Sequence, residues 1–376
     1  MRSGRYISQP SGYKAFIPNP LPPEPMNMDW EMQDLLSKAD RALGRLDGIT
    51  EILPNPDLFV AMYIKQEAVL SSQIEGTQAS LIDVLEFESE LAKGVLSDKK
   101  DVYEVINYIS AFNYGIERLK TFPMSLRLLK EIHARLLQNV RGAEKDPGQF
   151  RKSQNWIGHP GCLLSDASFV PPTVDEMNRS MGELELFLYN ESLHIPVLIK
   201  VGLVHAQFET IHPFLDGNGR MGRLLITFLL CNWGILQHPL LYLSYYFKKN
   251  RQQYYECLQG VRDHDRWEEW LKFFLNGVYS VSQEATTKAR EIVRMREQHR
   301  EIVGGMGQRA LPLLEYLYQS PVINVRRLAQ EIGIPYSTLN KTVAAFEDAG
   351  LLVNTSKTQR NRIYSYKQYL DLFQDM

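Results

Sequence analysis

The stretch HPFLDGNGRMGR, residues 212–223, is dense in charged side chains and glycines and joins two strongly apolar segments. Gly217 and Gly219 allow the backbone to turn sharply and to approach a ligand closely. A helix that begins just after them presents unpaired N–H groups and the positive end of its dipole. Because such a helix start binds phosphate groups well, the stretch predicts a phosphate cradle between two helices.

The charged side chains of this stretch suit a nucleoside triphosphate. Arg220 and Arg223 lie three residues apart on the first turn of the expected helix and can grip phosphate oxygens. Asp216 can hold a divalent cation such as Mg2+ through one carboxylate and the phosphates, and His212 can remove a proton from a hydroxyl. DGNG alone is a common turn and a lone histidine is more often structural, so the combination carries the prediction of phosphoryl or nucleotidyl transfer.

Apolar segments on both sides of the stretch predict buried helices. HIPVLIKVGLVHAQFETIH (194–212) is apolar nearly all round, as a central helix is. RLLITFLLCNWG (223–234) is equally apolar and ends at Gly234. LFVAMYIKQEAVLSSQIEG (58–76) predicts a further helix, because its apolar residues recur at helical spacing and Gly76 follows as a C-cap.

The rest of the pattern predicts a mainly α protein with little sheet. Helical periodicity runs from Trp30 to about Val140 and resumes at Val174. Between them, residues 141–173 are rich in Gly, Pro and Asp and predict a short β-hairpin flap. Residues 1–28 hold many prolines and predict an extended arm laid over the core.

The C-terminal part of the chain has a different pattern. Residues 284–307 carry opposite charges four apart and end in GGMG, which predicts a solvated helical linker. Residues 308–376 predict three helices and two strands around a polar tip, which make a winged helix-turn-helix. We therefore expect an N-terminal arm and helical region over 1–110, a core over 111–283, the linker, and a winged helix domain.

Composition sets broad limits on class and location. The chain has 376 residues, long enough for more than one core, and a formal net charge of −2 that gives no overall attraction to nucleic acid or anionic membranes. Its three cysteines are odd in number and far apart, which favours a reducing compartment. Without an apolar leader or a membrane-length apolar run, the sequence predicts a cytoplasmic protein.

At residues 212–223 the chain resembles the Fic (filamentation induced by cAMP) family, whose motif reads His-Pro-Phe-x-Asp-Gly-Asn-Gly-Arg-x-x-Arg. Every fixed position of the motif is present. The resemblance implies a helical Fic core and a protein adenylyltransferase that moves AMP from ATP to a Ser, Thr or Tyr hydroxyl, with Mg2+ or Mn2+ as the metal. It implies His212 as the catalytic base and Asp216 as the metal ligand.

The resemblance also assigns the nucleotide contacts. It implies that Arg223 reaches the γ-phosphate and that Asn250 and Tyr254, in KKNRQQYYECL (248–258), close over the adenine. Tyr254 can equally be a core residue, and Arg262 stands where some relatives carry Asn. The sequence therefore does not decide which residues form the adenine pocket. The other residues assigned to the nucleotide are those of the loop and helix start, Gly217, Asn218, Gly219, Arg220, Met221 and Gly222. Some relatives transfer UMP or phosphocholine instead.

Two further stretches extend the resemblance. GQFRKSQNWIGHPG (148–161) resembles the flap whose backbone edge aligns a target peptide, with an ordinary surface hairpin as the alternative. SSQIEG matches, at Ser71, Glu75 and Gly76, the pattern of an N-terminal inhibitory helix, here over about residues 60–76.

A carboxylate in this inhibitory position has a direct physical effect. If Glu75 reaches Arg223, it competes with the γ-phosphate for that guanidinium and leaves ATP in a pose unfit for attack. Glu75 is therefore predicted to be an off switch. Two alternatives stay open: a solvated helix face, and a role in positioning water that removes AMP from a modified target.

The expected partners are a target protein with an acceptor hydroxyl, the protein itself through self-modification, and a second copy in a homodimer. Residues 308–376 carry eight Lys or Arg and six Asp or Glu, a weak positive balance for DNA binding. Lys341, Lys357, Arg360 and Arg362 could nevertheless contact phosphates. A protein-docking module is the alternative, and the rival function is a nucleotide-sensing DNA-binding transcription regulator.

Overall fold

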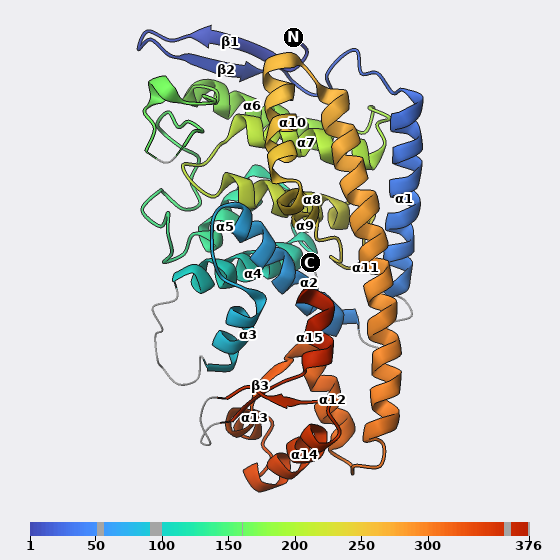
Figure 1. Ribbon diagram of the computed structural model, residues 1–376. Coiled ribbons are helices and arrows are strands. Elements are labelled where there is room, and N and C mark those ends of the chain that lie inside the picture. Colours follow the sequence, from blue (N-terminus) through green and yellow to red (C-terminus); the bar gives the residue numbers. More distant parts are fainter. Residues whose placement is uncertain (51–55, 91–99, 160, 357–361, 375–376) are drawn as a thin grey trace.

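The computed structural model describes residues 1–50, 56–90, 100–159, 161–356 and 362–374, and these form a mainly helical protein (Figure 1). The predicted fold class is confirmed in this respect. The strands in this part of the chain are short and form two small antiparallel sheets, one near each end of the sequence.

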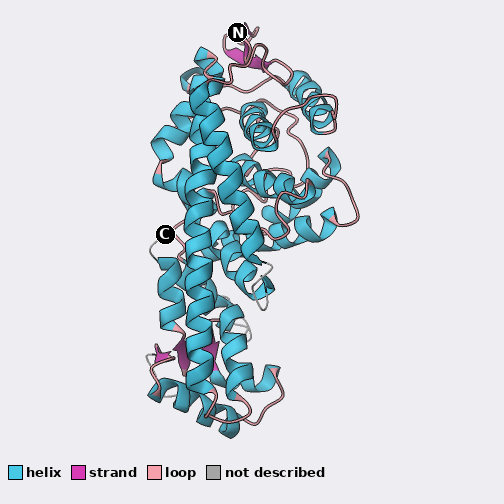
Figure 2. Cartoon of the chain, turned by 90° about the vertical axis from the view of Figure 1, so that its right-hand side faces the viewer, coloured by secondary structure: helices cyan, strands magenta, loops and turns pink. Residues whose placement is uncertain are grey.

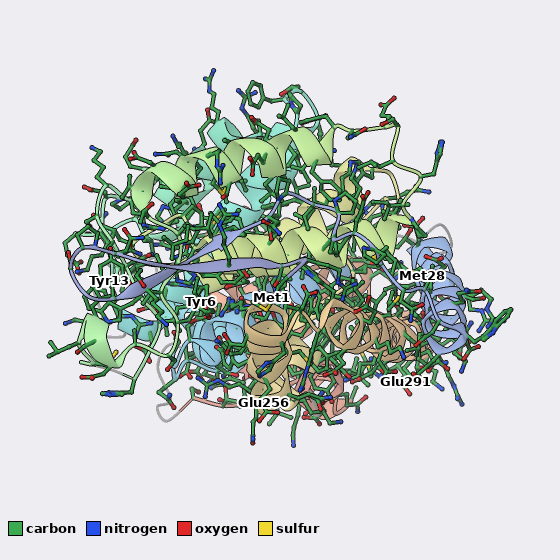
Figure 3. The ribbon with its side chains drawn as sticks, turned by 90° about the horizontal axis from the view of Figure 1, so that it is seen from above. Met1, Tyr6, Tyr13, Met28, Glu256 and Glu291 are labelled. Carbon is green, nitrogen blue, oxygen red and sulfur yellow. The ribbon has the colours of Figure 1, made fainter. Side chains whose placement is uncertain are left out.

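The N-terminal residues form a hairpin rather than the expected extended arm. Strand β1 (Gly4–Ser8) pairs antiparallel with β2 (Lys14–Pro18). The pairing satisfies the backbone groups that face each other across the two strands, and the buried Phe16 of β2 anchors the hairpin by donating its N–H to the carbonyl of Val170 at 2.9 Å. Seen from above, the hairpin crosses the helices of the core with Tyr13 near its turn (Figure 3).

Two buried helices occupy the centre, as the sequence predicts. Every residue of helix α7 (Val197–Ile211) from Leu198 onward except Lys200 is buried, and α8 (Asn218–Asn232) is buried over most of its length. The remaining helices of this part are α2 (Pro56–Ile74), α3 (Leu81–Glu90), α4 (Lys100–Leu119), α5 (Leu126–Leu136), α6 (Val174–Leu188), α9 (Ser244–Lys249) and α10 (Arg251–His264).

The expected linker is not a separate element. Residues 284–303 are the second half of α11 (Trp267–Val303), a single helix that runs from the core to the C-terminal domain beside α1 (Trp30–Thr50) (Figures 1 and 2). Buried Ala285, Ala289 and Ile292 continue its apolar stripe at helical spacing, so nothing in the sequence interrupts the helix at 284.

The expected flap hairpin is reduced to one bridge. Ile157 pairs with Phe169 in a single antiparallel bridge, and the tip holds a 3-10 turn, η2 (Leu164–Asp166), instead of strands. Side-chain hydrogen bonds, such as those from Gln154 to the carbonyls of Asn155 and Pro171, fix this segment in place of a ladder.

The C-terminal domain contains the three predicted helices, α12 (Ala310–Gln319), α13 (Val325–Glu331) and α14 (Tyr336–Asp348). It adds two elements that the sequence did not predict, β3 (Val322–Asn324) and α15 (Lys367–Gln374). Strand β5 (Ile363–Ser365) pairs antiparallel with both β3 and β4 (Val353–Asn354). Lys357 and Arg360 lie outside the described residues, and the winged helix assignment stays a prediction.

None of the helices in the described part of the chain combines the length and the apolar character that a bilayer crossing needs. The three cysteines, Cys162, Cys231 and Cys257, are free thiols.

Candidate active site

The loop between α7 and α8 turns through two left-handed residues. His212 has a φ of +51° at the end of α7, and Gly217 has a φ of +76° at the start of α8. The side chain of Asn218 fixes the turn, because its Oδ1 accepts from the N–H of Phe214 and its Nδ2 donates to the carbonyl of Phe214, both at 2.8 Å. The side chain of Asn218 is therefore occupied, and only its backbone N–H, at the start of α8, can bind a phosphate.

His212 is held as a neutral imidazole. Burial lowers its pKa to about 3, and the guanidinium of Arg262 adds to the shift. Its Nδ1 lies 3.3 Å from the carbonyl of Glu209. A proton on Nδ1 would donate to this carbonyl and leave the lone pair of Nε2 free to accept a proton from a hydroxyl.

Two flap residues that the sequence did not single out hold the backbone of His212. Arg151 Nε donates to the His212 carbonyl at 3.0 Å, and Asn155 Nδ2 donates to the same oxygen at 3.1 Å. Asn155 Nδ2 also reaches the carbonyl of Phe214 at 2.8 Å. Both residues are buried, and burial lowers the pKa of Arg151 to about 10. The flap thus acts as a brace for the loop.

His133 of α5 braces the loop from the other side and was also missed. Its ring stacks on Phe214 with centroids 3.7 Å apart, and its Nδ1 accepts from the N–H of Gly148 at 2.9 Å. Its Nε2 then carries the proton and donates to the carbonyl of Asp216 at 2.9 Å. Burial lowers the pKa of His133 to about 4, so the ring is neutral at physiological pH.

Asp216, the residue predicted to bind a metal, is a partly exposed carboxylate directly before α8. Its side chain is 33% exposed, and its Oδ1 accepts from the N–H of Gly217 at 2.5 Å. The described residues contain no cluster of three or more His, Cys, Asp or Glu that could hold a metal by themselves. A single partly exposed carboxylate beside a phosphate cradle fits Mg2+, which commonly takes one or two carboxylates and completes its shell with phosphates and water.

Arg220 is a buried cation with spare donors. Its side chain is 1% exposed, and its nearest anions, Asp216 and Glu104, lie 3.5 Å away. Its Nε and Nη1 make no hydrogen bond to the described residues. Burying donor atoms without hydrogen bonds is costly, so an anionic ligand at this point would satisfy the Nε and Nη1 groups of Arg220.

The two residues that follow Arg220 serve packing rather than a ligand. The side chain of Met221 is buried in the hydrophobic core. Gly222 provides room, because a Cβ built on it would lie 2.4 Å from Glu209 Oε1. Their predicted nucleotide contact is therefore limited to the backbone.

Arg223 is bound by the helix that carries the predicted inhibitory motif. Its Nη2 donates to Glu75 Oε1 at 2.7 Å and to the carbonyl of Ser71 at 3.0 Å, and its Nε donates to Ser71 Oγ at 2.8 Å. Burial disfavours the charged forms of Glu75 and Arg223, but the attraction between their opposite charges stabilises both charged forms. The pKa of Glu75 is accordingly lowered and that of Arg223 raised.

Two glycines make this approach possible. Gly219 lies under Glu75, and a Cβ built on it would fall 2.2 Å from Glu75 Oε1. Gly76 directly follows Glu75 with a φ of +98°, a conformation that favours glycine and turns the chain away from α2.

The predicted adenine contacts do not have the expected geometry. Tyr254 is 1% exposed, stacks on Phe247 with centroids 4.4 Å apart, and bonds His205 Nε2 through its hydroxyl at 2.9 Å. The amide of Asn250 donates to the carbonyl of Tyr246 at 2.9 Å. Tyr254 is thus a core residue, because it lies on the face of α10 that points to the interior. The neighbouring Tyr255 is 42% exposed.

Glu209 is a buried carboxyl group that sequence reasoning did not single out. Burial raises its pKa to about 7, and its Oε1 has no hydrogen-bond partner among the described residues. It lies one turn before His212 on the apolar helix α7. Its only sequence signal is a charged residue inside an otherwise apolar segment.

Comparison with known proteins places this site in a family. A model described as Fic/DOC family N-terminal matches residues 33–117, and one described as Fic/DOC family matches residues 123–230. Together the two matches cover about half of the chain. A Fic family protein from Desulfovibrio desulfuricans has a similar fold, with a TM-score of 0.59 and 21% identity over 91% of this chain and 97% of that one.

Two curated relatives are similar over a shorter span. The protein adenylyltransferase Fic of Aedes aegypti is 28% identical over 196 residues, 50% of this chain and 36% of that protein. A probable protein adenylyltransferase of Aquifex aeolicus is 28% identical over 208 residues, 54% of this chain and 57% of that protein. The chain therefore matches well under two thirds of either relative.

Proposed function

The chain belongs to the Fic/DOC family, and from this premise we propose that it is a protein adenylyltransferase restrained by Glu75. The enzyme would transfer AMP from ATP to a hydroxyl group of a target protein or of its own chain. Relatives named protein adenylyltransferase support this class of reaction.

The observation that carries the proposal is the pairing of open phosphate donors with a neutral base on one short loop. Arg220 has two buried donor atoms without a hydrogen-bond partner among the described residues, and the start of α8, which Glu75 covers at Gly219, can meet a phosphate once Glu75 is displaced. His212, a few residues before them, keeps a lone pair at physiological pH because burial lowers its pKa. A phosphate-binding helix start beside a proton acceptor favours transfer of a phosphorus group to a hydroxyl.

The proposed step conserves atoms and charge. The hydroxyl oxygen of the target bonds to the α-phosphorus of ATP, while the bond from that phosphorus to the bridging oxygen of the β-phosphate breaks. His212 takes the hydroxyl proton, and pyrophosphate leaves with the bonding electron pair. Arg220 and the N–H groups at the start of α8 balance the negative charge on the phosphates.

Asp216 would hold the divalent metal, which supplies charge neutralisation on the phosphates when bound. The chain's own contribution is to keep this carboxylate in place. The carbonyl of Asp216 is fixed by His133, and its carboxylate by the N–H of Gly217.

The proposed restraint rests on competition for Arg223. In the closed arrangement Glu75 and Ser71 occupy its Nε and Nη2, so a γ-phosphate would have to displace Glu75. Triphosphate binding without that displacement would leave the α-phosphorus out of line with the incoming hydroxyl, and transfer would be slow.

The test of the proposed chemistry uses Glu75→Gly protein with ATP labelled at either the α- or the γ-phosphate. We expect label in protein from α-labelled ATP only, and none from either nucleotide in Glu75→Gly/His212→Ala. Label from the γ-position would contradict AMP transfer and indicate a kinase. An outcome without label from either position, in the presence of Mg2+ and candidate protein acceptors, would contradict the enzyme and favour the rival DNA-binding regulator.

A further inference from the structure

The last described helix of the chain, α15, packs on the inhibitory helix α2. The ring of Phe373 meets the ring of Tyr63 edge to face, with centroids 5.5 Å apart. Gln66 Nε2 donates to the carbonyl of Phe373 at 3.3 Å. Figure 1 shows α15 next to α2, so the C-terminal domain reaches back to the helix that bears Glu75.

One row of residues, on α2 and on the turn that directly follows it, connects this contact to the active site. Tyr63, Glu67, Ser71 and Glu75 are spaced four apart, so they form a continuous ridge. The first contacts Phe373, and the last two hold Arg223. Because a helix rises 1.5 Å per residue, the ridge spans about 18 Å.

The middle of the ridge is also held. Glu67 accepts from Ser244 at the start of α9, from its Oγ at 2.5 Å and from its N–H at 3.2 Å. A helix bonded at successive turns moves as a unit, because sliding at one end breaks hydrogen bonds along its length. The position of Glu75 is therefore tied to the contact between α2 and α15.

Helix α15 is fixed to α11 as well as to α2. Lys288 Nζ donates to the carbonyl of Leu372 at 2.9 Å, and His299 bonds the hydroxyl of Tyr366, just before α15. Tyr369 and Phe373 are buried in this joint. The C-terminal helix thus lies as a wedge between the long helix of the molecule and the inhibitory helix.

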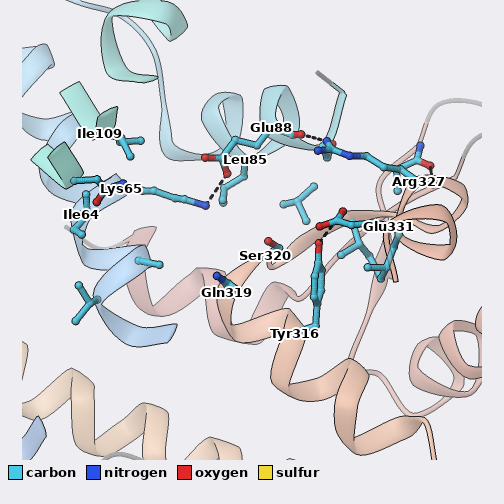
Figure 4. Close-up of a pocket in the computed structure, with 18 residues that line it drawn as sticks. Ile64, Lys65, Leu85, Glu88, Ile109, Tyr316, Gln319, Ser320, Arg327 and Glu331 are labelled. Carbon is cyan, nitrogen blue, oxygen red and sulfur yellow. Dashed lines mark hydrogen bonds and ion pairs between the residues drawn. The ribbon is translucent and has the colours of Figure 1, made fainter. Parts of the chain in front are cut away.

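The joint is incomplete on its other side. A cavity of about 570 Å³ is lined by residues of α2 and α3 on one side and of α12, β3 and α13 on the other (Figure 4). Its edge is bridged by the Lys65–Glu88 ion pair at 2.6 Å and by a hydrogen bond from Arg327 to the carbonyl of Glu88. The cavity interrupts the packing between the domain and α2, although α12 still contacts α2 and β3 contacts α3.

We propose that the C-terminal domain, through α15, holds the inhibitory helix in the position in which Glu75 binds Arg223. Loosening of the α15 contact releases Glu75 and activates the site. This regulation rests on the proposed function, but its physical part, the hold of α15 on α2, can be measured without the reaction.

The experiment compares four full-length proteins: wild type, Phe373→Ala, Glu75→Gly and the double variant. The readout is the initial rate of AMP incorporation from α-labelled ATP. We expect Phe373→Ala to raise the rate at least several-fold over wild type and to add nothing in the Glu75→Gly background. An unchanged rate in Phe373→Ala, or an equal increase in both backgrounds, would show that α15 does not act through Glu75.

A matched control and a milder variant guard against general unfolding. Lys367→Ala changes an exposed residue of the same helix and should behave as wild type. Gln66→Leu removes only the bond to the Phe373 carbonyl and keeps the side-chain volume, so it should activate in the same direction as Phe373→Ala with an unchanged melting temperature.

Amide hydrogen exchange separates failure of this inference from failure of the proposed function. We expect faster exchange at residues 70–76 in Phe373→Ala and Gln66→Leu than in wild type and Lys367→Ala. If Glu75→Gly incorporated no AMP, the proposed function would fall, and this exchange result would still decide the inference. Equal exchange in all four proteins would overturn it.

Discussion

Arg220 and Arg223 lie one turn apart at the start of α8 in opposite states. Arg223 donates to Ser71 and Glu75, whereas Arg220 keeps Nε and Nη1 without hydrogen-bond partners among the described residues. The difference follows from the distance to the nearest carboxylate. Glu75, directly after α2, approaches Arg223 over Gly219, whereas the carboxylates that face Arg220, those of Glu104 and Asp216, lie 3.5 Å away. One guanidinium is thus occupied by the protein and the other is left for a ligand.

The spare donors of Arg220 lead to a prediction in which stability and activity separate. Arg220→Met removes a buried cation from Glu104 and Asp216, which lie 3.5 Å away, but Glu104 keeps Arg141 at 3.3 Å, so we expect a melting temperature close to that of the parent Glu75→Gly protein. The same change should lower AMP incorporation about 100-fold or more, because it removes a donor aimed at the phosphates. Arg179→Met, which changes an exposed arginine on α6, is the matched control and should alter neither. Retained activity in Arg220→Met would contradict the phosphate role.

Glu209 predicts a pH-dependent stability. Because burial raises its pKa from an ordinary value of 4.5 to about 7, the folded protein keeps a proton on Glu209 where the unfolded chain has lost it. The free energy of unfolding should therefore fall as pH rises from about 4.5 to 7. The glutamine of Glu209→Gln does not titrate, so its free energy of unfolding should not fall in this way. Relative to wild type, the variant should become more stable by on the order of 1–3 kcal/mol between pH 4.5 and 8.

Urea unfolding at pH 5 and pH 8 measures this difference. Glu256→Gln, at an exposed position on α10, is the control and should track the wild type at both pH values. A Glu209→Gln advantage of the same size at both pH values would show that Glu209 does not hold a proton in the folded state.

At this scale the sequence points to residues that lie together in a motif, whose roles stay predictions, and misses the residues that support them from a distance. The roles expected of His212, Asp216 and the glycines follow from adjacent positions of one motif, and Ser71 and Glu75 from a second motif. Arg151, Asn155 and His133 brace the loop from positions roughly 60 to 80 residues away, a relation that no spacing in the sequence encodes. Tyr254 and Tyr255 are neighbours, so only the rotation of α10 decides which one is buried.

Among the elements, α4 and α8 pack unusually closely next to the site. A Cβ built on Gly115 of α4 would lie 2.4 Å from the ring of Phe228 on α8, and α4 also carries Glu104, which faces Arg220. The lack of a side chain at Gly115 therefore allows α4 and α8 to lie this close together.

Gly115→Ala should consequently destabilise the protein by about 1–3 kcal/mol, because the ring of Phe228 has to move within a packed core. Gly182→Ala on α6 is the matched control, since no atom lies within 4 Å of its added Cβ. The control should raise stability by about 0.5–1 kcal/mol through helix propensity. Denaturant unfolding of both variants gives the comparison, and equal effects would refute the close approach.

Periodicity predicts the helices well because each long helix buries a continuous stripe, as α7 and α8 do over nearly their whole surface. The short β elements are predicted poorly. The β1–β2 hairpin depends on packing of Phe16 near Val170, and the flap depends on side-chain bonds, neither of which leaves an alternating pattern. Helix α15 was also not predicted, because its burial depends on contacts with α2 and α11, which are far away in the sequence.

On the scale of the whole molecule, α11 and α15 join the C-terminal domain to the catalytic part. The sequence suggested a linker at 284–307 because charged residues alternate there, but buried Arg296 and its partner Glu315, 2.7 Å apart, show that this helix packs on the domain as well. The domain therefore packs on α11, and through α15 also on α2, instead of being joined by a separate linker.

The central claim is that the Glu75–Arg223 pair restrains a competent AMP transfer site. The most direct measurement is the intact mass of wild-type, Glu75→Gly and His212→Ala proteins after incubation with ATP and Mg2+. The account predicts a gain of AMP in Glu75→Gly, little in wild type and none in His212→Ala. Equal gains in wild type and Glu75→Gly would contradict the restraint, and a gain in His212→Ala would contradict the assignment of the catalytic base.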